Sequence, residues 1–337
     1  MKRAKSKSMS HVSPNDVSPV SVSVIIPAYN ASRTIGQTLE ALSRQQCFQP
    51  FEVIVVDDGS YDNTADIVCS FPAVCYVRQE NAGPAAARNH GARLARGEYL
   101  VFTDSDCIPH VDWISRLMEG FCQQQVGVVA GSYGIANHES RLSRCIYKEI
   151  RWRHHKLMPD FPNAFGSYNF CSKRNVFDEV GGFNTAYRCA SGEDNDLSYK
   201  IVNAGWRIYF ERKALVDHYH PTSVLKYLKE QFRHGRWRVK MYQDHPGMMR
   251  GDGYTFWKDI IEMPLAIAFL VGLVLSAFHG VRLNDVVFFL GAPFLIFEIV
   301  YAGIMTNCFF ESIYFGFVLF FRAFARMFGF TTGILTF

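Results

Sequence analysis

Two carboxylates separated by one residue stand in the segment GEYLVFTDSDC, at Asp104 and Asp106. An apolar run at residues 99–102 leads directly into them, and such a run predicts a buried β-strand. Ligands bind at the carboxyl ends of the strands in open α/β sheets, so the pair is expected at that edge. Two carboxylates this close can share one hard divalent cation, which takes substrate phosphates as further ligands. A solvated acidic turn is the alternative interpretation of so short a motif.

A second acidic run, GEDND, brings Glu193, Asp194 and Asp196 close together. Carboxylates this near to one another raise each other's pKa, which suits a general base that works near neutral pH. The same run also favours the start of a helix, because acidic side chains there complement the helix dipole. Both interpretations are compatible with the sequence.

The elements that must position these carboxylates alternate between strands and helices, which predicts a parallel α/β sheet for the first half of the chain. Pro27 is expected to stop the first strand and Ser32 to cap the first helix. Three of the strands lead into polar loops, which are expected on the same edge of the sheet. Strands are expected at residues 23–26, 52–56, 74–77, 99–102 and 214–216, and helices at residues 33–46, 63–70 and 85–96.

Composition excludes several classes of protein. The nine cysteines are scattered without a Cys-x-x-Cys pair, so the sequence predicts neither a zinc site nor a disulfide framework, and a reducing compartment fits best. The net charge is only +4, and no basic segment is interleaved with stacking aromatics, which argues against a nucleic-acid partner. Residues 1–20 are expected to form a disordered basic tail. No apolar segment follows them before the first strand, so no secretory signal is predicted.

The C-terminal part is almost free of charges. Residues 264–278, with their flanks, and residues 286–305 each come close to the roughly 20 apolar residues that a membrane helix needs. A third apolar stretch, residues 313–337, carries two arginines and is expected either to span the bilayer or to lie in its interface. The sequence therefore predicts a membrane domain of two to three helices at residues 258–337.

Charged residues near these stretches suggest how the chain meets the bilayer. Glu298 falls inside the second stretch, where an ionisable group is costly and usually paired; Arg322 or Arg326 is the expected partner. Residues 140–156 form a basic amphipathic segment, which is expected either to lie against the bilayer or to form an ordinary exposed helix. Because Lys and Arg concentrate before the apolar stretches, the preceding part is expected to face the cytoplasm.

Several segments, in order, resemble the motifs of family-2 glycosyltransferases. They are VSVIIPAYNASRTIGQTL, EVIVVDDGSYDNT, NAGPAAARNHG and GEYLVFTDSD, followed by SYNFCSKRNVFDEVGGFNTAY and GEDNDLSYKIVNAGW on the acceptor side. The resemblance covers roughly residues 22–240. It implies an α/β GT-A fold, a Rossmann-like nucleotide-diphospho-sugar transferase domain, at residues 21–245. It also implies inverting transfer of a sugar from a nucleotide-sugar donor such as a UDP- or GDP-sugar.

The resemblance also implies roles for individual residues. Asp104 and Asp106 would hold Mn²⁺ or Mg²⁺ against the donor diphosphate, with Asp106 the more direct ligand. Asp194 would be the catalytic base, and Glu193 would help to orient the acceptor. The implied donor-binding residues are Pro27, Ala28, Tyr29, Asp57, Asp58, Asn81, Arg88, Asp104 and Ser105.

Within this donor site, Asp57 would accept a hydrogen bond from the base or ribose. Arg88 has a planar guanidinium suited to a phosphate, although an exposed helix arginine is the alternative. Asp58 could equally well cap the following helix. His218 and His220 are expected near the metal or diphosphate, with His220 as a metal ligand, and a hydrogen-bonded loop histidine is the alternative.

Two extra residues between Gln231 and Arg236 distinguish this chain from the Gln-x-x-Arg-Trp signature of processive family members. Transfer of one sugar to a membrane-proximal acceptor hydroxyl, lipid-linked or on a polysaccharide, is therefore expected. A non-catalytic nucleotide-sugar-binding scaffold is one alternative. A haloacid-dehalogenase-like phosphatase is another, although the usual Thr or Val is missing two residues after Asp106 and the motif follows three earlier strands.

Overall fold

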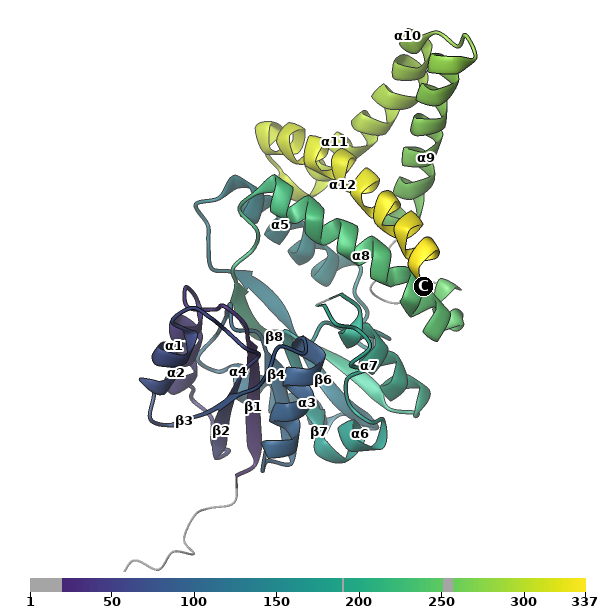
Figure 1. The fold of residues 1–337 in the computed structure, drawn as a ribbon. Coiled ribbons are helices and arrows are strands. Elements are labelled where there is room, and N and C mark those ends of the chain that lie inside the picture. Colours follow the sequence, from purple (N-terminus) through teal and green to yellow (C-terminus); the bar gives the residue numbers. More distant parts are fainter. Residues whose placement is uncertain (1–19, 190, 251–256) are drawn as a thin grey trace, which may run out of the picture.

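The computed structural model describes residues 20–189, 191–250 and 257–337. Its core is an eight-stranded mixed sheet in the order β3-β2-β1-β4-β7-β6-β8-β5, with helices packed around it (Figure 1). Residues 1–19, which carry most of the predicted basic tail, lie outside the described range. The strands are β1 Val22–Ala28, β2 Phe51–Asp57, β3 Val74–Arg78, β4 Tyr99–Thr103, β5 Cys107–Pro109, β6 Val126–Ile135, β7 Asn169–Lys173 and β8 Arg207–His218.

Helices connect these strands and then continue alone to the C-terminus. They are α1 Ile35–Ser43, α2 Thr64–Cys69, α3 Pro84–Leu94, α4 Trp113–Glu119, α5 Arg141–Lys156, α6 Arg174–Glu179, α7 Glu193–Asn203, α8 Val224–Asp244, α9 Trp257–Phe278, α10 Leu283–Val286, α11 Ala292–Thr306 and α12 Phe309–Thr336. Three short non-α turns complete the order: η1 Gly120–Cys122, η2 Pro246–Arg250 and the π-helical segment η3 Val287–Gly291.

The first four strands form the predicted parallel half of the sheet. β1 lies between β2 and β4 and is parallel to both, while β3 extends the sheet from β2. Both faces of β1 are covered, and its valines and isoleucines are fully buried, as expected for a central parallel strand. Because the chain leaves β1, β2 and β4 at the same edge, the polar residues that follow them meet there.

Two local expectations for this half are wrong. Pro27 lies inside β1; β4 pairs with β1 only as far as Ile25, so the missing N–H of Pro27 does not interrupt that ladder. Ser32 does not cap α1, which begins at Ile35 after Thr34 without a side-chain cap. The backbone N–H of Ser32 instead donates to Asp62.

The second half of the sheet is mixed. β7 runs antiparallel to both β4 and β6, and β6 is parallel to β8. The short strand β5 pairs antiparallel with the end of β8, where Cys107 lies opposite His218. This pairing turns the chain back immediately after the Asp104–Asp106 motif and brings the end of β8 beside it.

Three C-terminal helices among the described residues are long and apolar enough to cross a membrane: Trp257–Phe278, Leu283–Thr306 and Phe309–Thr336. In Figure 1, α9 and α11 project away from the sheet, whereas α12 runs alongside α8. The approach of α8 and α12 is very close, since a Cβ at Gly329 would lie 2.0 Å from the carbonyl oxygen of Phe232. The third apolar stretch therefore packs along α8.

Buried ion pairs join these helices to α5. Glu298 is paired with Lys258 at 2.8 Å, not with the expected Arg322 or Arg326. Those two arginines, on α12, instead pair with carboxylates of α5 and α9. The sequence alone does not show which helices lie next to one another, so it could not identify the partner of Glu298. The pairs are Arg322 with Glu149 and Glu262, Arg326 with Asp259 and Glu262, and Arg153 with Asp259 and Glu149.

The basic segment at residues 140–156, which was expected to lie against the bilayer or to be an exposed helix, forms helix α5. Arg144 and Lys148 both pair with Glu311 at the start of α12, and the Arg141 guanidinium lies 5.6 Å from the centre of the Tyr314 ring. Four basic side chains of α5 therefore contact the C-terminal helices: Arg141, Arg144, Lys148 and Arg153.

Candidate active site

The Asp104–Asp106 pair follows β4 at the carboxyl edge of the parallel strands. Both side chains are partly exposed, at 32% and 40%. His218 Nε2, at the end of β8, lies 3.5 Å from Asp106 Oδ1. The neighbouring pairing of Cys107 with His218 explains this approach. Burial raises the pKa of Asp106; His218 opposes the shift and Asp104 adds to it.

This group fits a divalent cation. Ligand atoms of Asp106, Cys107 and His218 lie within 4.8 Å of one another. Cys107 belongs to the buried hydrophobic core, which leaves carboxylate oxygens and an imidazole nitrogen as the accessible ligands. Such oxygen and nitrogen donors suit Mg²⁺ or Mn²⁺.

Of the two histidines considered from the sequence, His218 is the one that contacts Asp106. His220 lies behind it, with its Nδ1 3.1 Å from Nδ1 of His218. Burial, with a contribution from His218, lowers the pKa of His220 to about 3. His220 is only 4% exposed, and the group of possible metal ligands found among the described residues contains His218 instead; the role of His220 as a ligand stays a prediction.

Arg88 connects the two acidic motifs. Its Nη2 donates to Asp104 Oδ1 at 2.7 Å and its Nη1 to Glu193 Oε1 at 3.0 Å. The side chain is only 4% exposed, so the alternative of an exposed helix arginine is wrong. Helix α3 brings it inward because Gly91 packs directly against Ile25, where a Cβ would lie 2.4 Å from Cγ2.

The second acidic motif forms the first turn of α7, as the helix-start interpretation predicted. Gly192 precedes it with φ +116°, a conformation that favours glycine. Glu193 is buried and accepts a second hydrogen bond from the Ser191 N–H at 2.8 Å. Burial and then Asp194 raise the pKa of Glu193 to about 7, against the opposing charge of Arg88.

Asp194 differs from Glu193 in its surroundings. Its side chain belongs to a partly exposed residue, and Oδ1 accepts from the Asn195 N–H at 2.9 Å. Burial raises the pKa of Asp194, while Arg88 opposes the shift. The structure thus presents one carboxylate held by an arginine and, beside it, one that remains accessible.

On the donor side, Asp57 is fully buried at the end of β2. Its Oδ1 accepts from the Ser60 N–H and its Oδ2 from the Tyr76 hydroxyl, each at 2.7 Å. Although burial alone raises the pKa of Asp57, these hydrogen bonds and the charge of Arg78 lower it overall. Asp57 is therefore held as a carboxylate in a fixed orientation.

Asp58 does not cap α2, whose N-cap is Asn63. Its carboxylate accepts from the backbone N–H groups of Ala82 and Gly83, each at 2.9 Å, and its carbonyl accepts from Asn81 Nδ2 at the same distance. Asp58 and Asn81, both predicted to bind the donor, thus stabilise the turn that precedes α3, the helix that carries Arg88.

An aromatic pair stands at the same edge of the sheet. Tyr29, just after Pro27 and Ala28, is 50% exposed, and Tyr61 is 84% exposed. Their rings meet edge to face with centroids 6.1 Å apart. Tyr61 was not predicted from the sequence, although it directly follows the Asp57–Ser60 motif. The other predicted donor residue, Ser105, accepts a hydrogen bond from Thr38 through its carbonyl at 3.1 Å.

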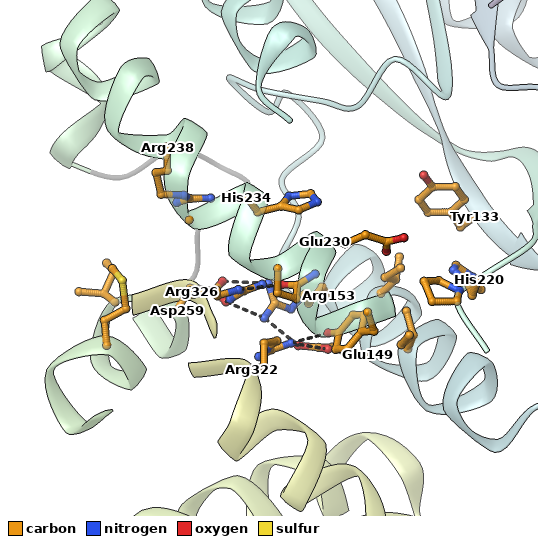
Figure 2. A pocket seen from close by; sticks show the side chains of 18 of the residues that line it. Tyr133, Glu149, Arg153, His220, Glu230, His234, Arg238, Asp259, Arg322 and Arg326 are labelled. Atoms are coloured by element: carbon orange, nitrogen blue, oxygen red, sulfur yellow. Dashed lines mark hydrogen bonds and ion pairs between the residues drawn. The ribbon is translucent and has the colours of Figure 1, made fainter. Parts of the chain in front are cut away.

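A cavity of about 430 Å³ begins beside this site. Its lining includes Tyr133, His218 and His220 from the ends of β6 and β8. From there it extends between α5, α8, α9 and α12 (Figure 2). The sequence contained no motif for this cavity, because its walls come from segments far apart in the chain.

Comparison with known proteins identifies the family. Residues 23–191, half of the chain, match the model of glycosyl transferase family 2. Glycosyltransferase AglE of Haloferax volcanii is 28% identical over 244 residues, which cover 70% of this chain and 79% of the relative. The pre-mycofactocin glycosyltransferase of Mycobacterium tuberculosis is 26% identical over 289 residues, which cover 80% of this chain but only 58% of the relative.

The fold also matches a solved structure, the mannosyltransferase PcManGT from Pyrobaculum calidifontis in complex with GDP-Man and Mn²⁺. The TM-score is 0.60 at 21% identity, over 94% of this chain and 91% of the other. This likeness confirms the predicted GT-A fold. Because the matching proteins are glycosyltransferases, the alternative of a haloacid-dehalogenase-like phosphatase is excluded. The chain is a glycosyltransferase and belongs to glycosyl transferase family 2.

Proposed function

We propose that this glycosyltransferase is a metal-dependent, inverting enzyme that moves one sugar from a nucleotide-sugar donor to an acceptor hydroxyl at a membrane. The observation that carries the proposal is the bridge through Arg88, which holds Asp104 and Glu193 together beside the accessible Asp194. The complex of PcManGT with GDP-Man and Mn²⁺ supports a nucleotide-sugar donor and a divalent cation for a chain of this fold.

In this proposal Asp104 and Asp106, with His218 beside them, would hold Mn²⁺ or Mg²⁺. When bound, the cation acts as a Lewis acid that neutralises the leaving diphosphate. Asp194 accepts the proton of the acceptor hydroxyl, whose oxygen attacks the anomeric carbon as the bond to the diphosphate breaks. A single displacement of this kind inverts the configuration at that carbon. Glu193 is held by Arg88 and so serves to orient rather than to accept the proton.

The nucleoside end of the donor is proposed to lie against Tyr29 and the buried Asp57. Tyr29 offers an exposed ring for the base, and Pro27 and Ala28 form the backbone beside it. The Ser60 N–H and the Tyr76 hydroxyl that fix Asp57 leave further lone pairs of its carboxylate for the base or ribose. A UDP- or GDP-sugar satisfies this arrangement.

The three apolar helices support attachment to a membrane. We propose a catalytic domain at residues 21–245 and a membrane domain at residues 258–337. The excess of Lys and Arg in the catalytic part supports a cytoplasmic location for it. A membrane-proximal acceptor, either lipid-linked or on a polysaccharide, follows from this arrangement.

Release of nucleoside diphosphate by the purified, detergent-solubilised chain tests the proposal. A panel of UDP- and GDP-sugars is offered with Mn²⁺ or Mg²⁺, beside an Asp104→Ala/Asp106→Ala control. We expect metal-dependent release from one donor, lost in the control. Release that survives in the control, or an absence of metal-dependent nucleotide binding in the intact chain, would contradict the proposed metal site.

Asp194→Asn tests the base. The amide keeps the size of the side chain but accepts no proton, so we expect transfer to fall by about 10²–10⁴-fold, the contribution typical of a general base. Nucleotide binding, measured by titration calorimetry with Mn²⁺, is expected to stay near the wild-type value. Turnover comparable to that of the wild type would rule out Asp194 as the base.

A further inference from the structure

The cavity beside the active site is built jointly by the catalytic part and the apolar helices. Figure 2 shows Tyr133 and His220 at one end and Arg238 and Asp259 toward the other. The first end lies next to His218, which contacts Asp106. A molecule in this cavity would therefore reach from the proposed metal site to the C-terminal helices.

The wall formed by α8 is polar along its length. Glu230, His234 and Arg238 line the cavity at intervals of four residues, a spacing that places side chains on the same face of a helix. His234 is an exposed residue whose side chain lines this space. A carboxylate, an imidazole and a guanidinium together offer both acceptors and donors, as a hydroxyl-rich ligand requires.

The opposite wall is charged but balanced. Arg153, Arg322 and Arg326 line the cavity, and each forms ion pairs with two of the three carboxylates Glu149, Asp259 and Glu262. Lys258 pairs in addition with Glu262 and with Glu298, so four cations are matched by four anions and this network needs no further counter-ion. That balance favours a neutral polar head over a strongly anionic one.

The end away from the metal site has apolar side chains beside Arg238 and Asp259. Ile260, Met263 and Phe330 contribute to it from α9 and α12, both of which are apolar enough to cross a membrane. Ile260 is 56% exposed, so this part of the lining is not covered by other described residues. An apolar chain could leave here along α9 into a bilayer.

From these observations we infer that the cavity binds the acceptor, and that the acceptor is a glycolipid: a sugar head on a single apolar chain. The head lies along Glu230 and His234 with a hydroxyl toward His218 and the metal site, and the chain leaves past Met263 and Phe330. This inference rests on the proposed transferase function and names the acceptor class for it.

Photolabelling tests the site directly. The full chain is placed in phosphatidylcholine nanodiscs with a probe that carries a glucose head on a twelve-carbon chain ending in a diazirine. Labelled peptides are mapped by mass spectrometry. We expect labels near Met263 and Phe330, reduced at least 10-fold by His234→Trp, which fills the cavity. Arg233→Trp, on the neighbouring exposed residue of α8, is the matched control and should label like the wild type.

A second pair of variants guards against misfolding of the first. Met263→Trp fills the cavity from α9, and Ile267→Trp adds the same ring to an exposed position of that helix. A diazirine-tagged dodecane without a sugar head should label only outward residues such as Ile267 and Val271. Equal labelling by the glucoside in the cavity-filling and control variants, or labels confined to those outward residues, would overturn the inference.

Nucleotide release from the UDP- and GDP-sugar panel is measured on the same samples. Cavity labelling without any donor turnover would support the glycolipid site while counting against the proposed transfer. Metal-dependent donor turnover without cavity labelling would leave the transferase standing and would reject the glycolipid site. The two proposals therefore fail in different measurements.

Discussion

At the scale of single residues, Arg88 joins the donor side of the site to the acceptor side. It is buried between Asp104 and Glu193, and its planar guanidinium reaches two carboxylates in different directions at once. A lysine at this position keeps the charge but offers one compact ammonium group. The orientation of both acidic motifs therefore depends on a side chain that need not touch substrate.

We expect Arg88→Lys to lower kcat by about 10- to 100-fold, because a misplacement of order 1 Å in a positioned site has effects of that size. Thermal stability and nucleotide binding should change much less, since the buried charge is retained. Steady-state kinetics that separate kcat from KM provide the measurement. Arg93→Lys, at an exposed position of the same helix, is the control, and equal kcat in both variants would refute this role.

His154 is a second buried residue with a measurable consequence. It is 2% exposed and its Nδ1 lies 2.8 Å from the Ser132 hydroxyl. Burial, then the charges of His155, Arg153 and Arg212, lowers its pKa from 6.5 to about 3. Below pH 6.5 the unfolded chain binds a proton at His154, whereas the folded chain binds it only near pH 3. Protonation of the unfolded chain therefore lowers the free energy of unfolding as the pH falls from 6.5 toward 3, and this loss is absent above pH 6.5.

Each pH unit below 6.5 lowers the free energy of unfolding by about 1.36 kcal/mol through His154, so the loss at pH 5 is about 2 kcal/mol. We expect His154→Gln, which does not titrate, to lose less stability than the wild type between pH 7.5 and pH 5. The melting temperature in detergent at both pH values is the readout. His138→Gln removes an exposed histidine outside this cluster and should keep the wild-type pH dependence; identical pH dependence in the two variants would be evidence against the assignment.

At the scale of elements, α12 docks on α8 through glycines. A Cβ at Gly329 or Gly333 would lie 2.0 Å or 2.5 Å from a backbone oxygen of α8, and one at Gly235 would lie 2.2 Å from Arg326 O. Gly329 and Gly333 are four residues apart, the spacing at which small residues let helices approach closely. Since the cavity lies between these helices, their separation sets its width.

We expect Gly329→Ala to destabilise the protein by about 1–3 kcal/mol, the usual cost of overpacking. The clash is with backbone, so the helices must move apart. Gly303→Ala in α11 is the control, because its Cβ would meet Ser312 only at 3.5 Å, and alanine there should be neutral or stabilising by about 1 kcal/mol. Melting temperatures in detergent compare the two, and an unchanged value for Gly329→Ala would contradict the packing argument.

The sequence predicts some of these elements and not others, for physical reasons. β1, β2 and β4 carry continuous apolar runs because both of their faces are buried. The helices that connect these strands have regular apolar faces. β6 does not show such a pattern, since it contains Gly131 where a Cβ would lie 2.3 Å from Ala214 O. A glycine that permits a close backbone approach weakens the strand signal.

The candidate site divides in the same way. Asp104, Asp106 and Asp194 were predicted because each lies in a local motif. The contact of Arg88 with Glu193 joins residues 105 positions apart, and the pairing of Lys258 with Glu298 joins two different helices. Such partners depend on tertiary packing that no spacing along the chain reports.

At the scale of the whole molecule, the catalytic part and the C-terminal helices share a hydrophobic cluster. Leu142 and Ile146 of α5 and Tyr227 of α8 pack with Tyr301 and Phe315 of α11 and α12. The buried ion pairs lie beside this cluster and carry equal numbers of positive and negative groups. Docking of the two parts therefore depends on keeping this charge balance as well as on apolar contact.

Arg322 and Glu149 allow that dependence to be measured. Arg322→Met leaves Glu149 and Glu262 without a cation that contacts both, and Glu149→Met leaves an excess of positive charge. We expect each single variant to lose about 3–5 kcal/mol, the cost of an uncompensated buried charge. The double variant restores neutrality and adds apolar surface, so it should be more stable than either single variant. This non-additivity is the signature of a coupled network.

Melting temperatures of the four proteins in the same detergent complete this cycle, with Arg44→Met, at an exposed pair with Glu40 in α1, as the control for simple loss of an arginine. That surface pair should contribute at most about 1 kcal/mol. If the Arg322 and Glu149 losses add in the double variant, each residue acts independently of the other. If the double variant recovers stability, charge neutrality between α5 and α12 holds the catalytic part against the apolar helices, and with it the walls of the cavity that the proposed glycolipid must enter.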